Sequence, residues 1–114
     1  MSKDSGSEFN SFADFWPYYL QEHQRRETRL VHVLGTTLAL LVLLLGALSF
    51  NFYLLLAAPL AGYGFAWFSH ILIEKNKPAT WRFPLWSLLG DLQMWRLWIS
   101  GKLEAELVEH NIMT

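Results

Sequence analysis

Two consecutive stretches decide the fold: LVHVLGTTLALLVLLLGALSF, residues 30–50, and FYLLLAAPLAGYGFAWFSHILI, residues 52–73. Neither contains a charged residue, and each reaches the about 20 residues that a helix needs to cross the apolar core of a bilayer. A soluble protein could bury such a hairpin, but a chain of 114 residues has little protein with which to cover it. The sequence therefore predicts an all-α integral membrane protein built on a two-span transmembrane helical hairpin that turns at Asn51.

Amphipathic segments flank the predicted hairpin. Aromatic residues recur at helical spacing over about residues 12–29 and are dense again over residues 83–99, which is typical of helices that lie at a membrane surface. Ser11 or Asp14 could cap the first of these helices, and Pro17 is tolerable only in its first turn. We expect two interfacial helices, one on each side of the hairpin.

The predicted domain organisation is simple. Residues 11–101 form a single membrane domain, preceded by a disordered tail over residues 1–10 and followed by a charged C-terminal tail over residues 102–114. Residues 81–99 also permit a re-entrant helix or a third span, although polar and charged residues interrupt them.

Composition and charge limit the possible functions. The chain has no cysteine, which excludes disulfides, thiolate metal sites and c-type haem attachment. Its net charge of −1 gives no reason to expect nucleic acid as a partner. Basic residues lie on both outer sides of the hairpin: Arg25, Arg26, Arg29, Lys75, Lys77 and Arg82. The positive-inside rule then places both termini in the cytosol, at the inner membrane of a bacterium or the endoplasmic reticulum of a eukaryote.

Two histidines lie at matching depths in the predicted hairpin. His32 and His70 are each 19 residues from Asn51, so both stand about 28 Å from the turn. Each shares a helix face with small residues that let membrane helices approach closely: Gly35, Thr36 and Ala39 in the first span, and Ala58, Gly62 and Ala66 in the second. Both imidazoles are therefore expected at the helix–helix interface. The alternative is that they cap carbonyls or anchor lipid headgroups.

Further candidate ligands surround this pair. His23 precedes His32 by nine residues, half a turn out of phase on a continuous helix, so the two converge only if the chain bends between them. Glu74 follows His70 by four residues and Glu27 follows His23 by four, which places each pair on one helix face. Asp91 is the sole acid of the aromatic C-terminal segment and a candidate ligand or general base. Glu74 and Asp91 could equally be plain interfacial residues, and Glu27 is a weaker candidate because arginines lie next to it. Histidine with carboxylate and no thiolate suits Fe(II), Mn or Zn.

These residues resemble a known family. The stretches PYYLQEHQRRETRLVH (17–32) and FSHILIEKNKPA (68–79), within a resemblance over roughly residues 12–98, are similar to the yeast-type 2-hydroxy fatty acid dioxygenases. PLWSLLGDLQMW (84–95) is similar to a bacterial branch. The chain departs from the family pattern at Thr28, where Asn is usual, and at Ser69, where Gly is frequent.

The resemblance implies a membrane-bound, Fe(II)-dependent enzyme of fatty acid alpha-oxidation. Such an enzyme uses O₂ to shorten a long-chain 2-hydroxy fatty acid by one carbon. By position, His23, His32 and His70 would be the iron-associated histidines, with Glu74 matching the acid after the third. We therefore expect the three histidines as metal ligands, and Glu74 and Asp91 as catalytic residues.

Two other functions stay open from the sequence. One is a non-enzymatic membrane protein that binds or organises lipid, with interfacial histidines. The other is a b-type haem protein with His32 and His70 as axial ligands, which the small residues disfavour because a haem needs the helices held apart. A homo-oligomer is compatible with every one of these functions.

Overall fold

The computed structural model describes residues 9–112, and within them the chain forms helices and no strand. The expectation of an all-α fold is confirmed. Residues 1–8 of the expected disordered tail lie outside the described residues. In chain order the elements are α1 (Phe12–Gln21), α2 (Arg26–Ser49), α3 (Phe52–Phe68), the π-helical segment η2 (Ser69–Glu74), the short 3₁₀ segment η3 (Ala79–Trp81), α4 (Pro84–Ile99) and α5 (Leu103–Glu109).

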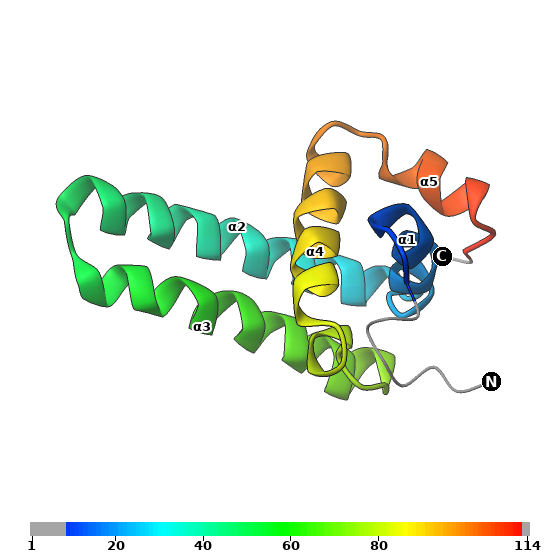
Figure 1. The fold of residues 1–114 in the computed structure, drawn as a ribbon, viewed down its shortest axis with the longest axis horizontal. Coiled ribbons are helices and arrows are strands. Elements are labelled where there is room, and N and C mark those ends of the chain that lie inside the picture. The colour runs from blue at the N-terminus through cyan, green and yellow to red at the C-terminus, as the bar shows by residue number, and fades with distance from the viewer. Residues whose placement is uncertain (1–8, 113–114) are drawn as a thin grey trace.

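The long helices α2 and α3 form the expected antiparallel hairpin (Figure 1). At its tip Phe50 takes a left-handed conformation (φ 54°), and the Asn51 side chain caps α3 by accepting hydrogen bonds from the backbone N–H groups of Tyr53 and Leu54. The small residues bring the helices into close contact. A Cβ added to Gly35 would lie 2.5 Å from Cβ of Phe65, and one added to Gly62 would lie 3.2 Å from Cβ of Ala39. The predicted small-residue interface is confirmed.

Much of the hairpin surface is apolar and exposed. Arg26–Ser49 and Phe52–Glu74 are both long and apolar enough to cross a membrane. The core helix of a soluble protein would be mostly buried, whereas side chains such as Leu48 (71 % exposed) and Phe50 (94 % exposed) protrude from this hairpin. The expectation of two helices of membrane-spanning length is thus confirmed for the described residues.

Helix α4 lies across the hairpin near its open end, where α1 and α5 also gather (Figure 1). It begins with Pro84, which fits the first turn of a helix because that position needs no backbone donor. With 16 residues, α4 is not among the described helices that are long and apolar enough to cross a membrane. The protein core lies between α1, α4 and α5 and includes Phe15, Tyr19, Leu20, Phe83, Met94, Leu97 and Leu107.

Three local expectations differ from the structure. The helix expected over residues 12–29 is divided, since α1 ends at Gln21 and α2 begins at Arg26. The expectation that Pro17 needs the first turn is wrong: Ser11 caps the helix, so Pro17 is its sixth residue. The bond that Pro17 cannot donate would go to Ala13, an exposed residue whose carbonyl water can satisfy.

The third difference concerns the expected charged tail over residues 102–114. Its described part folds back onto the core as α5, with Leu103 and Leu107 buried. Trp16 ties α5 to α1, because its indole Nε1 donates to the Glu106 carboxylate at 2.6 Å.

Candidate metal centre

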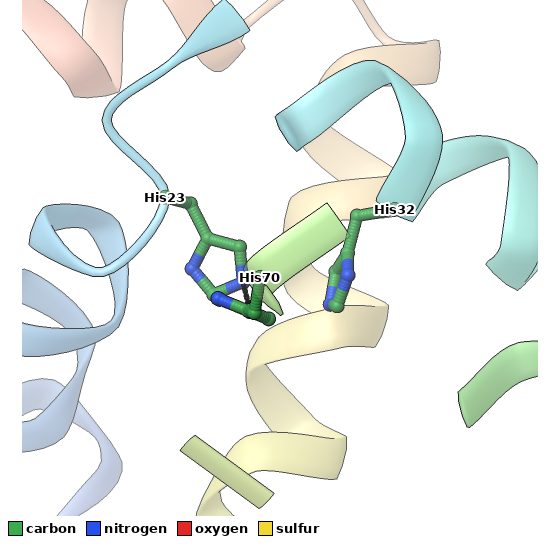
Figure 2. Close-up of side chains that lie close together, drawn as sticks. All are labelled: His23, His32 and His70. Atoms are coloured by element: carbon green, nitrogen blue, oxygen red, sulfur yellow. Dashed lines mark hydrogen bonds between the residues drawn. The ribbon is translucent and has the colours of Figure 1, made fainter. Parts of the chain in front are cut away.

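Three buried histidines converge at the open end of the hairpin. His23 lies in the loop between α1 and α2, His32 on α2 and His70 in η2. Their ring centroids are 4.7 Å apart for His23 and His32, 4.4 Å for His23 and His70, and 5.6 Å for His32 and His70. Figure 2 shows the three side chains lying close together, each from a different segment of the chain. Each offers a ring nitrogen, and these three atoms all lie within 4.8 Å of one another.

The break between α1 and α2 is what brings His23 to the other two histidines. On a continuous helix His23 and His32 would point in different directions, but the loop over residues 22–25 removes that constraint. Two charged side chains hold the loop. The buried guanidinium of Arg29 donates to the carbonyls of His23 (2.9 Å) and Gln24 (2.8 Å). The Glu74 carboxylate accepts the backbone N–H groups of Gln24 and Arg25.

Each histidine is oriented by a hydrogen bond on its outer ring nitrogen. His23 Nδ1 lies 2.7 Å from the carbonyl oxygen of Tyr19, which can only accept, so this nitrogen carries the proton. His32 Nε2 donates to Oδ1 of Asp91 at 2.6 Å. His70 Nδ1 donates to Oδ1 of Asn76 at 2.8 Å. The Asn76 amide is itself fixed, because its Nδ2 donates to the Glu22 carbonyl at 3.1 Å.

The inner nitrogens consequently present lone pairs to one another. In the neutral tautomers set by these contacts, Nε2 of His23 and Nε2 of His70 are both acceptors, yet they lie 2.9 Å apart. Nδ1 of His32 is buried and has no hydrogen-bond partner. Lone pairs this close repel unless a cation lies between them. The arrangement therefore calls for a proton or a metal ion at its centre.

A metal ion fits this centre better than a proton does. Burial above all, and then the neighbouring imidazoles of His32 and His70, lower the pKa of His23 well below its ordinary value, so an added proton is disfavoured there. Outer hydrogen bonds to carbonyl and carboxylate oxygens are also the usual support of metal-binding histidines.

The haem alternative fits this geometry poorly. A bis-histidine haem needs its two imidazoles on opposite faces of a porphyrin. The His23 ring lies beside both His32 and His70, at centroid distances of 4.7 and 4.4 Å, so a porphyrin between these two would overlap it. Because Gly35 packs closely against Phe65, there is no room for a porphyrin between the two helices.

The structure separates the three candidate acids. Asp91 belongs to the centre through its bond to His32. Glu74 lies beside it but uses both oxygens to hold the loop, with Thr28 Oγ1 as a third donor at 2.6 Å. Glu27 is exposed, and its Oε1 lies 4.0 Å from Nε of Arg25. The expectation that Glu27 shares a helix face with His23 is wrong, because His23 lies in the loop.

Sequence reasoning missed several supporting residues. The charge pattern indicates only that Arg29 is a basic residue flanking a span, and the turn pattern indicates only that Asn76 lies in a turn. Neither pattern gives a sign of a buried partner. The two departures from the family pattern also have structural roles. Thr28 is fully buried and donates to Glu74, and Ser69 is fully buried and donates to the carbonyl of Ala66 at 2.7 Å.

A cavity of about 260 Å³ opens beside His32 and Asp91. It lies between α2, α3 and α4, with His32, Thr36 and Asp91 among its polar lining residues. Toward the hairpin tip its walls are aliphatic, formed by residues that include Leu40, Leu43 and Pro59. A ligand with a polar head and an apolar chain matches this distribution.

Comparison with known proteins agrees with the geometry. Neither the curated proteins nor the solved structures yield a match to this chain. The model of one protein family, described as 2-hydroxy-palmitic acid dioxygenase Mpo1-like, matches residues 9–103, a stretch that includes all three histidines, Glu74 and Asp91. The chain therefore belongs to the 2-hydroxy-palmitic acid dioxygenase Mpo1-like family.

Proposed function

We propose that this protein is a membrane-bound, Fe(II)-dependent dioxygenase that shortens a 2-hydroxy fatty acid by one carbon. The observation that carries the proposal is the convergence of three imidazole lone pairs at the polar end of an apolar cavity. Membership of the family supports the reaction class. Histidine ligands without thiolate suit Fe(II).

His23, His32 and His70 would hold the ion, with Tyr19, Asp91 and Asn76 orienting their rings. An iron(II) ion bound there would supply the redox chemistry and a binding position for O₂. One 2-hydroxy acid and one O₂ balance to the shortened acid, CO₂ and water. The protein's own task is to place C1 and C2 of the substrate beside the three histidines.

Asp91 is suited to recognise the substrate hydroxyl. Tyr19 and His32 both donate to its Oδ1, and no described residue donates to its Oδ2. Asp91 also lines the cavity, where the free oxygen can accept the proton of a 2-hydroxyl group. The acyl chain would extend past Leu40 and Leu43 toward the tip of the hairpin. We therefore propose Asp91 as the proton acceptor, and Glu74 as the residue that holds the His23 loop.

We further propose that the hairpin is inserted in a bilayer with both termini in the cytosol. Its exposed leucines would contact lipid acyl chains. Arg25, Arg26, Lys75 and Lys77 flank the open end, whereas the tip around Asn51 carries no charge. The centre and the mouth of its cavity would then lie near the cytosolic surface, where α4 packs against the hairpin and α1 packs against α4 as interfacial helices.

The test is turnover by anaerobically purified protein in detergent. After loading with Fe(II), 2-hydroxypalmitic acid and O₂ are added, and the products are identified by mass spectrometry. The proposal expects about one iron per chain and an acid one carbon shorter. His110, which lies outside the centre near Glu106, provides the matched control His110→Ala beside His70→Ala.

The possible outcomes separate the parts of the proposal. Iron at one per chain without product would leave the metal centre standing and overturn the substrate. Binding of the fatty acid with neither iron nor turnover would overturn both and favour a non-enzymatic lipid-binding protein.

A further inference from the structure

We propose that Tyr19 is a positioning residue that sets the orientation of two of the three histidines at once. The inference rests on the proposed metal centre and goes beyond it, since Tyr19 offers no atom to the ion itself. It is carried by contacts from three separate parts of this residue: its backbone carbonyl, its ring and its hydroxyl group.

The backbone and ring of Tyr19 act on His23. The Tyr19 carbonyl oxygen accepts the Nδ1 proton of His23 at 2.7 Å, which turns Nε2 of His23 toward the centre. The Tyr19 ring stacks on the imidazole, with centroids 4.1 Å apart and planes 26° apart. His23 lies in a loop, so no helix backbone fixes its direction, and these two contacts replace that constraint.

The hydroxyl group of Tyr19 acts on His32 through Asp91. It donates to Oδ1 of Asp91 at 2.7 Å, and the same oxygen accepts the Nε2 proton of His32 at 2.6 Å. With its carboxylate held from α1, Asp91 can take only one direction toward His32. In this arrangement Nδ1 of His32 is buried and has no hydrogen-bond partner among the described residues.

The close packing of Tyr19 against α4 supports this role. Its side chain is fully buried, and Gly90, the residue before Asp91, lies flat against the ring. A Cβ added at Gly90 would lie 2.5 Å from the ring, so only glycine lets α4 approach closely enough for Asp91 to reach the hydroxyl. Tyr19 thus connects α1 with α4 directly and with α2 through Asp91, next to the interruption between α1 and α2.

The substitution Tyr19→Phe tests the hydroxyl contact alone. It keeps the carbonyl and the stacked ring and removes only the donor to Asp91. We expect the affinity for Co²⁺, used as a spectroscopic probe, to fall about 10-fold, within the range that loss of an outer partner costs. The visible absorption of the bound Co²⁺ should also change, because the imidazole of His32 becomes free to turn. Tyr53→Phe, at the exposed tip of the hairpin, is the matched control and should leave both readouts unchanged.

A double-variant cycle separates positioning from a general loss of packing. If Tyr19 acts on His32 through Asp91, Tyr19→Phe should have no further effect on Co²⁺ affinity in an Asp91→Ala background. In an Asp91→Asn background, which keeps an oxygen able to accept both donors, Tyr19→Phe should still weaken binding. Circular dichroism of each variant identifies any that fail to fold. If Asp91→Ala does not fold, the comparison can still be made in the Asp91→Asn background.

The outcomes distinguish this inference from the proposed function. Unchanged Co²⁺ affinity and spectrum in Tyr19→Phe would overturn the role of Tyr19 while leaving the centre intact. Equal loss in the wild-type and Asp91→Ala backgrounds would show that the hydroxyl acts by another route. Wild-type protein that binds Co²⁺ but converts no 2-hydroxy acid would overturn only the proposed reaction. A wild type that binds no Co²⁺ would overturn the inference and the metal centre together.

Discussion

The two ends of the hairpin differ in which side chains they expose and which they bury. At the tip, apolar side chains such as Leu48 and Phe50 are mostly exposed, and few polar groups are present. At the open end, polar side chains that include His23, Thr28, Arg29, Ser69 and His70 are almost fully buried, and hydrogen bonds join them. The hairpin therefore exposes apolar side chains at its tip and buries polar side chains at its open end.

This contrast shows what α1, α4 and α5 contribute. Polar groups buried in a bilayer are costly, whereas near its surface other helices can cover and pair them. The three shorter helices gather only around the open end, where they provide Tyr19, Asp91 and a small protein core (Figure 1). The hairpin supplies the apolar wall of the cavity together with His32 and His70. Helix α4 supplies Asp91, which orients His32, whereas His70 is oriented by Asn76 in the loop after η2.

The largest expected effect comes from removing a ligand at the open end. His70→Ala takes away one of three converging lone pairs and leaves Asn76 without its donor. We expect metal affinity to fall by more than the roughly 100-fold that loss of an outer partner can cost, with product formation falling to background. Metal analysis of the purified variant measures this. A His70→Ala protein with wild-type metal content would show that the cluster is not the binding site.

The second effect comes from placing a charge toward the tip. Leu41 is 56 % exposed near the middle of the first apolar stretch. If this surface faces lipid, Leu41→Lys should cost about 3 kcal/mol of insertion free energy and reduce the membrane-bound fraction after cell fractionation. Leu85→Lys, at a 75 % exposed position outside the hairpin, is the control and should remain in the membrane fraction. Equal recovery of the two variants would place the tip of the hairpin in water.

Between the two ends, the contact of α2 with α3 gives a smaller effect. A Cβ at Gly35 would lie 2.5 Å from Cβ of Phe65, so Gly35→Ala must push the helices apart. Overpacking of this kind costs about 1–3 kcal/mol. Gly64→Ala is a matched control, since a Cβ there meets nothing within 4 Å and alanine favours a helix. Thermal unfolding in detergent should therefore shift down for Gly35→Ala and not for Gly64→Ala; the opposite order would contradict the packing.

The sequence allowed the hairpin to be predicted more fully than the centre. The equal distances of His32 and His70 from Asn51, and the small residues beside them, follow from helical geometry alone. The position of His23 does not, because it depends on a break in the helix whose cause lies elsewhere, in Arg29 and Glu74. From the sequence alone, a charged residue next to a predicted span is interpreted as a surface residue, because its distant partners are not known.

The smallest expected effect concerns that break in the helix. Thr28 is fully buried, and its hydroxyl donates to Glu74 at 2.6 Å, which joins α2 to the end of η2. Thr28→Val keeps the shape but removes the donor, and losing a hydrogen bond to this half-buried carboxylate costs about 1–3 kcal/mol. Glu74 retains its two backbone donors in the loop, so we expect the lower end of this range and a slight loss of metal affinity.

Thr28→Ser, which keeps the hydroxyl, is the control. It should restore the metal affinity if the hydrogen bond matters, and should not if the methyl group matters. Because the hydroxyl lies outside the histidine cluster, such a rescue would show that the clamp on the loop, and not contact with the ion, connects Glu74 to the centre.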